Sequence, residues 1–214
     1  MKKITYLAMS MAMFAFMSCS AEKAETVVEN NSESKEEIPS ATVATGKYKI
    51  KSGTIEFESS MGPVKSRKVV HFDDYGSKER VENYDNGDAL KGYNTSDGKT
   101  RYFIDVESKT AWISDQNGSL GWEMKFHSWE ELDRQGQTKD YTRVEDITVA
   151  GKQCEAYEYR GSTVFAGWQG LTLYQKQEPN ILVEAVKLDE NVNHDPAIFG
   201  VPEGFEVKER PTYN

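Results

Sequence analysis

The chain has 214 residues, of which 37% are hydrophobic and 11% aromatic, and its formal net charge at pH 7 is −9. This aromatic content excludes a chain that is disordered throughout, because disordered proteins contain few aromatic residues. The acidic balance argues against nucleic acid as a partner, since binding to phosphates depends on an excess of Lys and Arg.

The first 18 residues have the layout of a secretory signal, with a basic start, an apolar stretch and a small residue before the cleavage site. Lys2 and Lys3 supply the charge, and residues 4–17 follow without any charged side chain. This apolar stretch is too short for a helix across a bilayer, which needs ~20 residues. The chain that remains after removal of residues 1–18 has 24 basic and 35 acidic residues, a net charge of −11.

Cys19 directly follows the small residue Ser18, and the pair resembles the cleavage site of a bacterial lipoprotein signal. In such proteins the cysteine thiol receives a diacylglycerol, the peptide is cut before it, and the new amine is acylated. Phe16 and Met17 depart from the usual lipoprotein box, but the looser boxes of Bacteroidota lipoproteins are similar. The resemblance implies a lipid on Cys19, and the alternative is ordinary cleavage near Ala21 with release of a soluble protein.

Residues 19–46 are predicted to be an acylated, disordered tether. Residues 20–45 include six Glu and no aromatic residue, a composition typical of disorder. A flexible segment of this length spans about 30 Å, which would hold a domain clear of the bilayer. Ser20 replaces the Asp that retains enterobacterial lipoproteins in the inner membrane, so we expect an outer-membrane location, facing the periplasm or the cell surface.

Residues 47–214 are predicted to form one β-domain, because apolar residues recur with a period of two from Lys47 onwards. Turn sequences such as Met61-Gly62-Pro63 and Ser96-Asp97-Gly98 separate the strands. Strands are expected in residues 47–57, with a bulge at Ser52–Gly53, and in residues 64–72, 79–84, 90–94, 101–106, 110–114 and 120–126. The last two of these are expected to pair as a hairpin.

The period of two breaks at residues 128–131, Ser-Trp-Glu-Glu, which have the sequence of a capping box. A helix of about two turns can run from there to Gln135 and end at Gly136. Strands are then expected in residues 141–149, 152–159, 163–168, 171–175 and 181–188, and a single helical turn in residues 195–199. Because the connections are too short for parallel crossovers, we predict a mainly β fold with one antiparallel sheet of about eleven strands and one or two short helices.

This order of elements resembles the LolA/LolB-like half-barrels, envelope proteins in which one long antiparallel sheet curls around an apolar cavity under short helices. Residues 149–157, 167–173 and 199–205 are similar to uncharacterised Bacteroidota outer-membrane lipoproteins of this kind. The resemblance implies a curved half-barrel that binds an apolar ligand such as an acyl chain or a lipidated protein. The chain departs from the carriers in having no clear helix before Tyr48 and only a short helix after Ser128.

Apolar side chains in the predicted strands form the candidate face for such a ligand. The candidates are Trp122, Met124, Phe126, Trp168, Leu171, Leu173, Ile181 and Val183. The same residues could equally form solid core between the sheet and the helix. The protein would then be a structural or interaction lipoprotein that contacts an envelope partner without a small ligand.

We predict no catalytic residue, metal site or cofactor. His71, His127 and His194 show no metal-binding spacing, and the sequence has no nucleophile elbow or phosphate loop. Cys154 stands among apolar residues and is expected to be a buried, inert thiol. We therefore expect a monomeric, non-enzymatic protein whose partners are a membrane, through the lipid on Cys19, and lipid or lipidated protein, but no nucleic acid.

Replacing Cys19 with Ser removes the thiol that would carry the lipid. The Cys19→Ser protein should therefore be recovered in soluble form or as uncut precursor when cells are fractionated. The Cys154→Ala variant is the matched control, and it should stay in the membrane fraction. Recovery of the Cys19→Ser protein with the outer membrane would contradict the predicted anchor.

Overall fold

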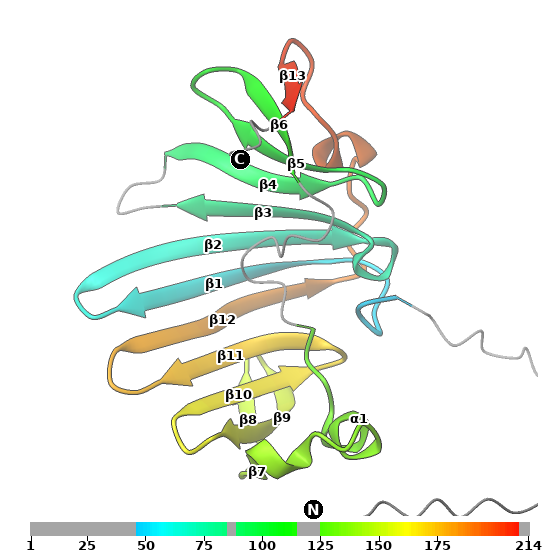
Figure 1. The fold of residues 1–214 in the computed structure, drawn as a ribbon. Coiled ribbons are helices and arrows are strands. Elements are labelled where there is room, and N and C mark those ends of the chain that lie inside the picture. Colours follow the sequence, from blue (N-terminus) through cyan, green and yellow to red (C-terminus); the bar gives the residue numbers. More distant parts are fainter. Residues whose placement is uncertain (1–45, 85–88, 115–124, 210–214) are drawn as a thin grey trace, which may run out of the picture. The chain divides into compact units, whose positions relative to one another are not determined.

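The computed structural model describes residues 46–84, 89–114 and 125–209. These residues form thirteen strands of one sheet, one α-helix and three short 3₁₀ helices (Figure 1). The fold is mainly β, and the sheet is curved and not closed, which confirms the fold class predicted from the sequence. The predicted acyl site at Cys19 lies outside the described residues.

The first six strands form an antiparallel meander. They are β1 (Gly53–Met61), β2 (Val64–Asp73), β3 (Lys78–Tyr84), β4 (Leu90–Ser96), β5 (Arg101–Asp105) and β6 (Thr110–Ser114), with the 3₁₀ helix η1 (Asp74–Gly76) between β2 and β3. β1 begins later than predicted, because residues 46–51 form bends. Tyr48 donates its amide to the carbonyl of Tyr75 and Lys49 donates to Gln169, so this segment bonds to two loops instead of a strand. The predicted bulge at Ser52–Gly53 is therefore wrong, and the irregularity lies between Glu56 and Phe57.

The helix follows the first meander and begins as predicted. It is α1 (Trp129–Arg134), and it is followed by the 3₁₀ helix η2 (Thr138–Asp140). The Ser128 hydroxyl accepts the amide hydrogen of Glu131, and the Glu131 carboxylate accepts that of Ser128. This reciprocal pair satisfies two amides that have no partner within the helix and confirms the capping box.

The second group of strands is also antiparallel. It contains β7 (Tyr141–Arg143), β8 (Ile147–Val149), β9 (Lys152–Tyr159), β10 (Thr163–Trp168), β11 (Leu171–Gln177) and β12 (Ile181–Glu190). The predicted strand over residues 141–149 is two short strands, which pair with opposite ends of β9. β12 then pairs with β1 along the whole length of β1 and joins the two groups into one sheet.

The last strand pairs with β6, for which the sequence predicted residues 120–126 as the partner. After the 3₁₀ helix η3 (Pro196–Phe199), β13 (Glu206–Glu209) pairs with β6 in the one parallel ladder among the described strands. Lys125 instead forms a bridge with Leu171, and Phe126 donates its amide to Gly170. The predicted hairpin of residues 110–114 with 120–126 is thus wrong at its described end, while residues 120–124 lie outside the described residues.

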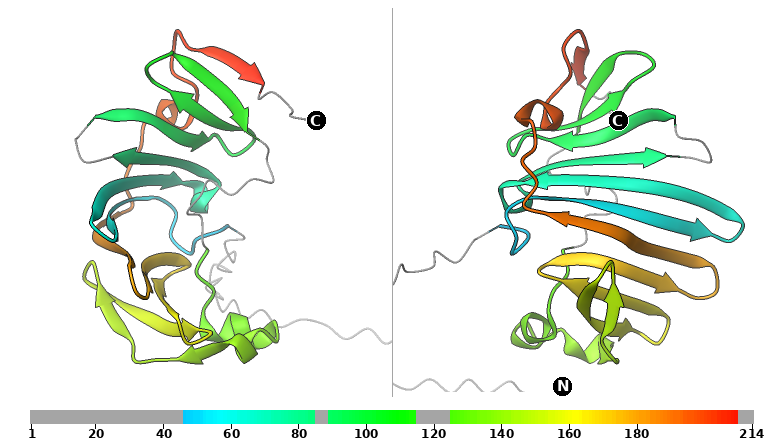
Figure 2. Two further views of the ribbon diagram at one scale, coloured as in Figure 1. Left: turned by 60° about the vertical axis from the view of Figure 1, so that its left-hand side comes forward. Right: turned by 180° about the vertical axis from the view of Figure 1, so that it is seen from behind.

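The sheet bends around the side on which residues 46–52 and α1 lie (Figure 2). The largest apolar cluster draws on the central strands and on Tyr48, whose ring meets Phe72 edge to face at 4.9 Å between ring centroids. A second cluster surrounds Ile104, and a third lies beneath α1 around Leu132 and Phe126. The core is therefore divided into three apolar clusters along the sheet.

Gly167 gives a test of the packing beneath α1. A Cβ atom at this position would lie 2.1 Å from Cγ of Phe126 and 2.5 Å from the carbonyl oxygen of Leu171. Gly167→Ala should therefore lower the free energy of unfolding by about 3 kcal/mol, the upper end for overpacking. Gly200→Ala, where the nearest atom is 3.8 Å away, is the control and should change little. Urea unfolding measures both, and equal stability of the two variants would contradict this packing.

Candidate functional site

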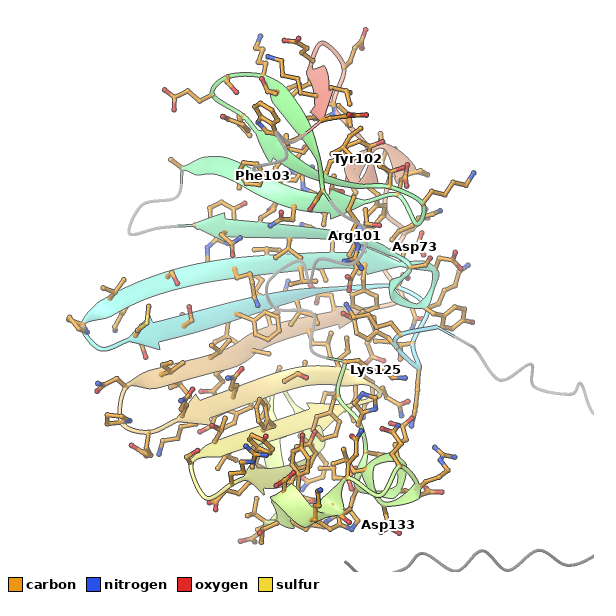
Figure 3. All side chains as sticks on the ribbon, viewed as in Figure 1. Asp73, Arg101, Tyr102, Phe103, Lys125 and Asp133 are labelled. Atoms are coloured by element: carbon orange, nitrogen blue, oxygen red, sulfur yellow. The ribbon has the colours of Figure 1, made fainter. Side chains whose placement is uncertain are left out.

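One face of the four central strands, here called the inner face, carries both apolar side chains and a buried ion cluster. Its members are Ile55 and Phe57 on β1, Lys68 and Val70 on β2, Glu79 and Val81 on β3, and Val183 on β12, which all line one cavity. Successive side chains of a strand point to opposite faces, so their neighbours Glu58, Arg67 and Glu184 lie on the outer face. Figure 3 shows side chains projecting from both faces of the sheet.

Two cavities adjoin along the inner face. The first has a volume of about 40 Å³ and is closed by Tyr48 and Leu171, and the second, of about 210 Å³, extends towards the hairpin between β1 and β2. Phe57, Lys68 and Val183 line both cavities, so together these form one groove with its closed end beyond Lys68. At the open end Met61 is 65% exposed and Val64 is 53% exposed.

The pairing of β1 with β2 explains the hollow. On the inner face, Phe57 stands opposite Lys68, Ser59 opposite Ser66, and Met61 opposite Val64. The two serines are small, and their hydroxyl oxygens lie 2.7 Å apart, so they satisfy each other by a hydrogen bond. A small, internally satisfied pair between two bulky pairs leaves a depression in the floor of the groove.

The closed end of the groove contains buried charges. Glu79 is 3% exposed, and its two carboxylate oxygens each accept a hydrogen bond from Nζ of Lys47 at 2.9 Å. The Tyr48 hydroxyl also donates to this carboxylate. Lys68 is 8% exposed, and its ammonium lies 4.6 Å from the centre of the Phe57 ring, a favourable cation–π contact.

Burial and the neighbouring Glu79 carboxylate act on the pKa of Lys68 in opposite directions. Burial lowers the pKa of Lys68 to about 8, because desolvation disfavours the ammonium, and the Glu79 carboxylate offsets only part of this effect. Lys68 and Glu79 are the charged residues among the described lining of the two cavities, and Lys47 reaches Glu79 from the side. The Glu79 carboxylate therefore bonds to Lys47 and Tyr48 and also acts through its charge on the ammonium of Lys68.

The structure divides the predicted ligand face among several places. Leu171 and Val183 line the smaller cavity, and Ile181 and Val183 line the larger one. Leu173 is fully buried in the core. Phe126 packs beneath α1 and, with Trp168, lines a separate hollow of about 230 Å³ beside the helix. Trp122 and Met124 lie outside the described residues.

The charged residues of the groove are absent from the predicted face, although the sequence carries a signal for them. In β2, Lys68 occupies the same phase of the period as Val70 and Phe72, and in β3, Glu79 shares the phase of Val81. A charged residue in the inward phase of a strand is costly to bury and is therefore a candidate for a functional role. Motifs and apolar residues alone do not reveal this signal.

The outer face of the same strands carries a network of polar side chains around Glu82. The carboxylate of Glu82 accepts hydrogen bonds from Arg80 and from the Tyr84 hydroxyl, each at 2.7 Å, and His71 lies 3.8 Å away. Burial alone would raise the pKa of Glu82, but the hydrogen bonds from His71 and Tyr84 and the charge of Arg80 lower it to about 2. The network continues to neighbouring elements, since Arg80 also donates to the carbonyl of Ile198 and His71 lies 3.2 Å from the Thr54 hydroxyl.

The remaining candidate residues do not assemble into a reactive centre. His71 and His194 stack edge to face at 5.4 Å between ring centroids, whereas His127 lies beside Glu131 of α1. Cys154 is fully buried, and burial raises the pKa of its thiol. Within the described part of the chain, no group of three or more His, Cys, Asp or Glu residues could hold a metal ion.

The described residues also lack a helix that is long and apolar enough to cross a bilayer.

No protein-family model matches the sequence, and no curated protein sequence matches it. Among solved structures, an uncharacterized conserved protein from Thermus thermophilus is similar, with a TM-score of 0.50 and 11% identity over 75% of this chain and 91% of that one. MucB in the MucA/MucB complex of Pseudomonas aeruginosa has a TM-score of 0.45 and 14% identity, with 78% of this chain and 60% of that chain covered. PNGF-II has a TM-score of 0.43 and 12% identity, with 75% and 32% covered. At these identities the similarity concerns the fold alone.

The pKa of Lys68 predicts how stability depends on pH. The ordinary value of 10.5 applies to the unfolded chain, and the folded value is about 8. Between these pH values the unfolded chain binds the proton and the folded protein does not, so this lysine makes the free energy of unfolding rise with pH. Below pH 8 the buried ammonium costs about 3 kcal/mol, at 1.36 kcal/mol per pKa unit.

Lys68→Met should therefore raise the free energy of unfolding at pH 7 by up to about 3 kcal/mol, and the difference from wild type should shrink between pH 8 and pH 10.5. Urea unfolding of both proteins across this range measures the difference in their free energies of unfolding. Groups that titrate equally in both proteins do not contribute to this difference. Lys65→Met, on an exposed position of the outer face, is the matched control and should be neutral. A difference that does not vary with pH would contradict a buried ammonium.

Proposed function

We propose that the protein is an envelope lipoprotein, anchored in the outer membrane through Cys19, whose inner face binds an apolar ligand such as an acyl chain or the acyl part of a lipidated protein. The observation that carries the binding proposal is the open groove of about 210 Å³ between the β1–β2 hairpin and β12. Its wall includes Phe57, Ile181 and Val183, and its mouth exposes Met61 and Val64. Apolar walls with few polar groups are typical of small-ligand sites.

The anchor supports this proposal from the sequence side. A lipid on Cys19 and an acidic tether would keep the domain beside a membrane, where acyl chains and lipidated proteins are abundant. Two or more acyl chains give stable anchoring at ~0.8 kcal/mol for each buried CH₂ group. The proposal includes no catalytic step and no cofactor, and it treats the protein as a monomer that faces the periplasm or the cell surface.

A second function is favoured by the size of the groove. Its volume of about 210 Å³ lies below the ~300 Å³ at which ligand pockets usually begin. In this alternative the exposed Met61 and Val64 contact an envelope partner protein, and no small ligand is bound. Ligand binding in the groove predicts that a large side chain at Ser66, on its floor, weakens the uptake of an apolar probe. Partner contact at the mouth predicts no uptake of such a probe.

Ser66→Trp should fill the hollow and weaken the binding of an uncharged fluorescent naphthylamine dye at least tenfold. The indole would occupy the space between the bulky pairs, while the backbone of β2 keeps its ladder. Lys65→Trp is the matched control, since it adds the same ring one residue away on the outer face. Dye titration measures the affinity, and circular dichroism confirms folding of each variant.

Two results would contradict ligand binding at this place. The first is a wild-type protein that takes up no dye, which would favour the interaction alternative. The second is equal weakening by Ser66→Trp and Lys65→Trp, since a site in the groove should respond to only one of them.

A further inference from the structure

The groove ends at one aromatic side chain, and the position of this side chain limits what the groove can hold. We propose that Tyr48 is the end wall of the groove, so that the protein binds a single acyl chain of up to about sixteen carbons with its head group at the mouth. The inference rests on the proposed function and adds the number, the length and the direction of the bound chain.

Tyr48 is held in place from several sides. Its ring meets Phe72 edge to face at 4.9 Å between ring centroids, and its hydroxyl donates a hydrogen bond to Glu79. Gly76 leaves space for the ring, because a Cβ atom at this position would lie 2.6 Å from Cδ2 and from Cε2 of Tyr48. The Tyr48 amide donates to the carbonyl of Tyr75. A side chain that is held by its ring, its hydroxyl and its backbone gives the groove an end at a defined position.

The smaller cavity brings the groove up to this wall. It has a volume of about 40 Å³, and Tyr48, Ile55, Val70 and Val81 are among the residues that line it. Ile55 stands opposite Val70, and Val70 stands opposite Val81, so a row of apolar side chains crosses three strands in front of the ring. A space of this size admits the end of a hydrocarbon chain but not a polar head group with its hydration water. The head group therefore has to stay at the open mouth.

The strands set the length of the groove. From Met61 at the mouth to Ile55 it runs for about six residues of β1, which is about 20 Å at ~3.3 Å per residue. With C–C bonds of ~1.5 Å, an extended hydrocarbon chain advances ~1.25 Å per carbon, so roughly sixteen carbons fit this length. At Ser59 and Ser66 the hollow lies over one pair of strands, which are ~4.8 Å apart, and this width suits one chain.

The test measures how affinity depends on chain length. Saturated 1-monoacylglycerols with chains of eight to twenty carbons share one uncharged head group. Their displacement of the naphthylamine dye from the purified protein gives the affinity for each. For wild type the affinity should rise severalfold with every two carbons, reach its maximum at about sixteen carbons and rise no further.

Substitution of Tyr48 should move this maximum. Tyr48→Ala removes the ring and leaves an apolar cavity, which a chain end can enter. The maximum should therefore move to chains that are about four carbons longer. Tyr48→Phe keeps the ring without its hydroxyl, so it should keep the maximum of wild type and separate the wall from the hydrogen bond to Glu79.

A second variant acts in the opposite direction and does not remove a core side chain. Val81→Ile adds one methylene group to the lining of the smaller cavity. It should weaken the binding of the sixteen-carbon ligand at least threefold and leave the twelve-carbon ligand, which ends before this cavity, within twofold of wild type. Val186→Ile is the matched control, since Val186 is 51% exposed on the outer face, and it should change neither affinity. Circular dichroism checks the folding of every variant, and Val81→Ile decides the question if Tyr48→Ala does not fold.

The failures of this inference and of the proposed function can be told apart. A folded Tyr48→Ala protein with the maximum of wild type would overturn the inference and leave the proposed function standing. Equal weakening of the two ligands by Val81→Ile would do the same, as would a diacylglycerol that binds as tightly as the sixteen-carbon ligand. If wild type binds none of the monoacylglycerols, both proposals fail.

Discussion

The pairing of β1 with β12 is the interaction on which the rest of the structure depends. It joins a strand near the start of the domain to one near its end, over the nine residues from Gly53 to Met61. Without this ladder the chain would form two separate meanders, each with an unpaired edge and an apolar face open to water. Loop closure over so many residues is entropically costly, so the pairing must be supported by packing along its whole length.

Packing supports this ladder unevenly along its length. Near Gly53 the inner face is closed, because residues 46–52 cross it and Tyr48 packs on Phe72. Near Met61 no described segment covers the same face, and the strands there run on as an exposed hairpin. One continuous sheet therefore provides a core at one end and a groove at the other, with Lys68 and Glu79 at the boundary.

The sequence predicted the parts of this fold that depend on local chemistry. The capping box at Ser128 and the strands on either side of Gly62 follow from turn, capping and alternation rules that act within a few residues. The placements that it missed depend on distant partners. Residues 46–51 alternate like a strand but bond to the carbonyls of Tyr75 and Gln169, and β13 takes the edge of β6 although the two are far apart in the chain.

The candidate site shows the same limit. Leu171, Ile181 and Val183 could be chosen from the sequence because they are apolar and lie in strands, and they line the groove. The separation of Phe126 from them could not, since it depends on how α1 covers the sheet. Lys68 could have been found from its inward phase, but its link to Glu79 requires the pairing of β2 with β3.

Two departures from good packing occur at the same place. A core optimised for stability would have large apolar residues in place of the Ser59–Ser66 pair, and it would not bury an ammonium at Lys68. Each feature alone could be tolerated anywhere in the sheet, but they are consecutive along one groove and lie on the same two strands. Natural proteins depart from such packing rules at functional sites and compensate elsewhere. The hollow and the buried ammonium thus lie together in the groove in which we propose ligand binding.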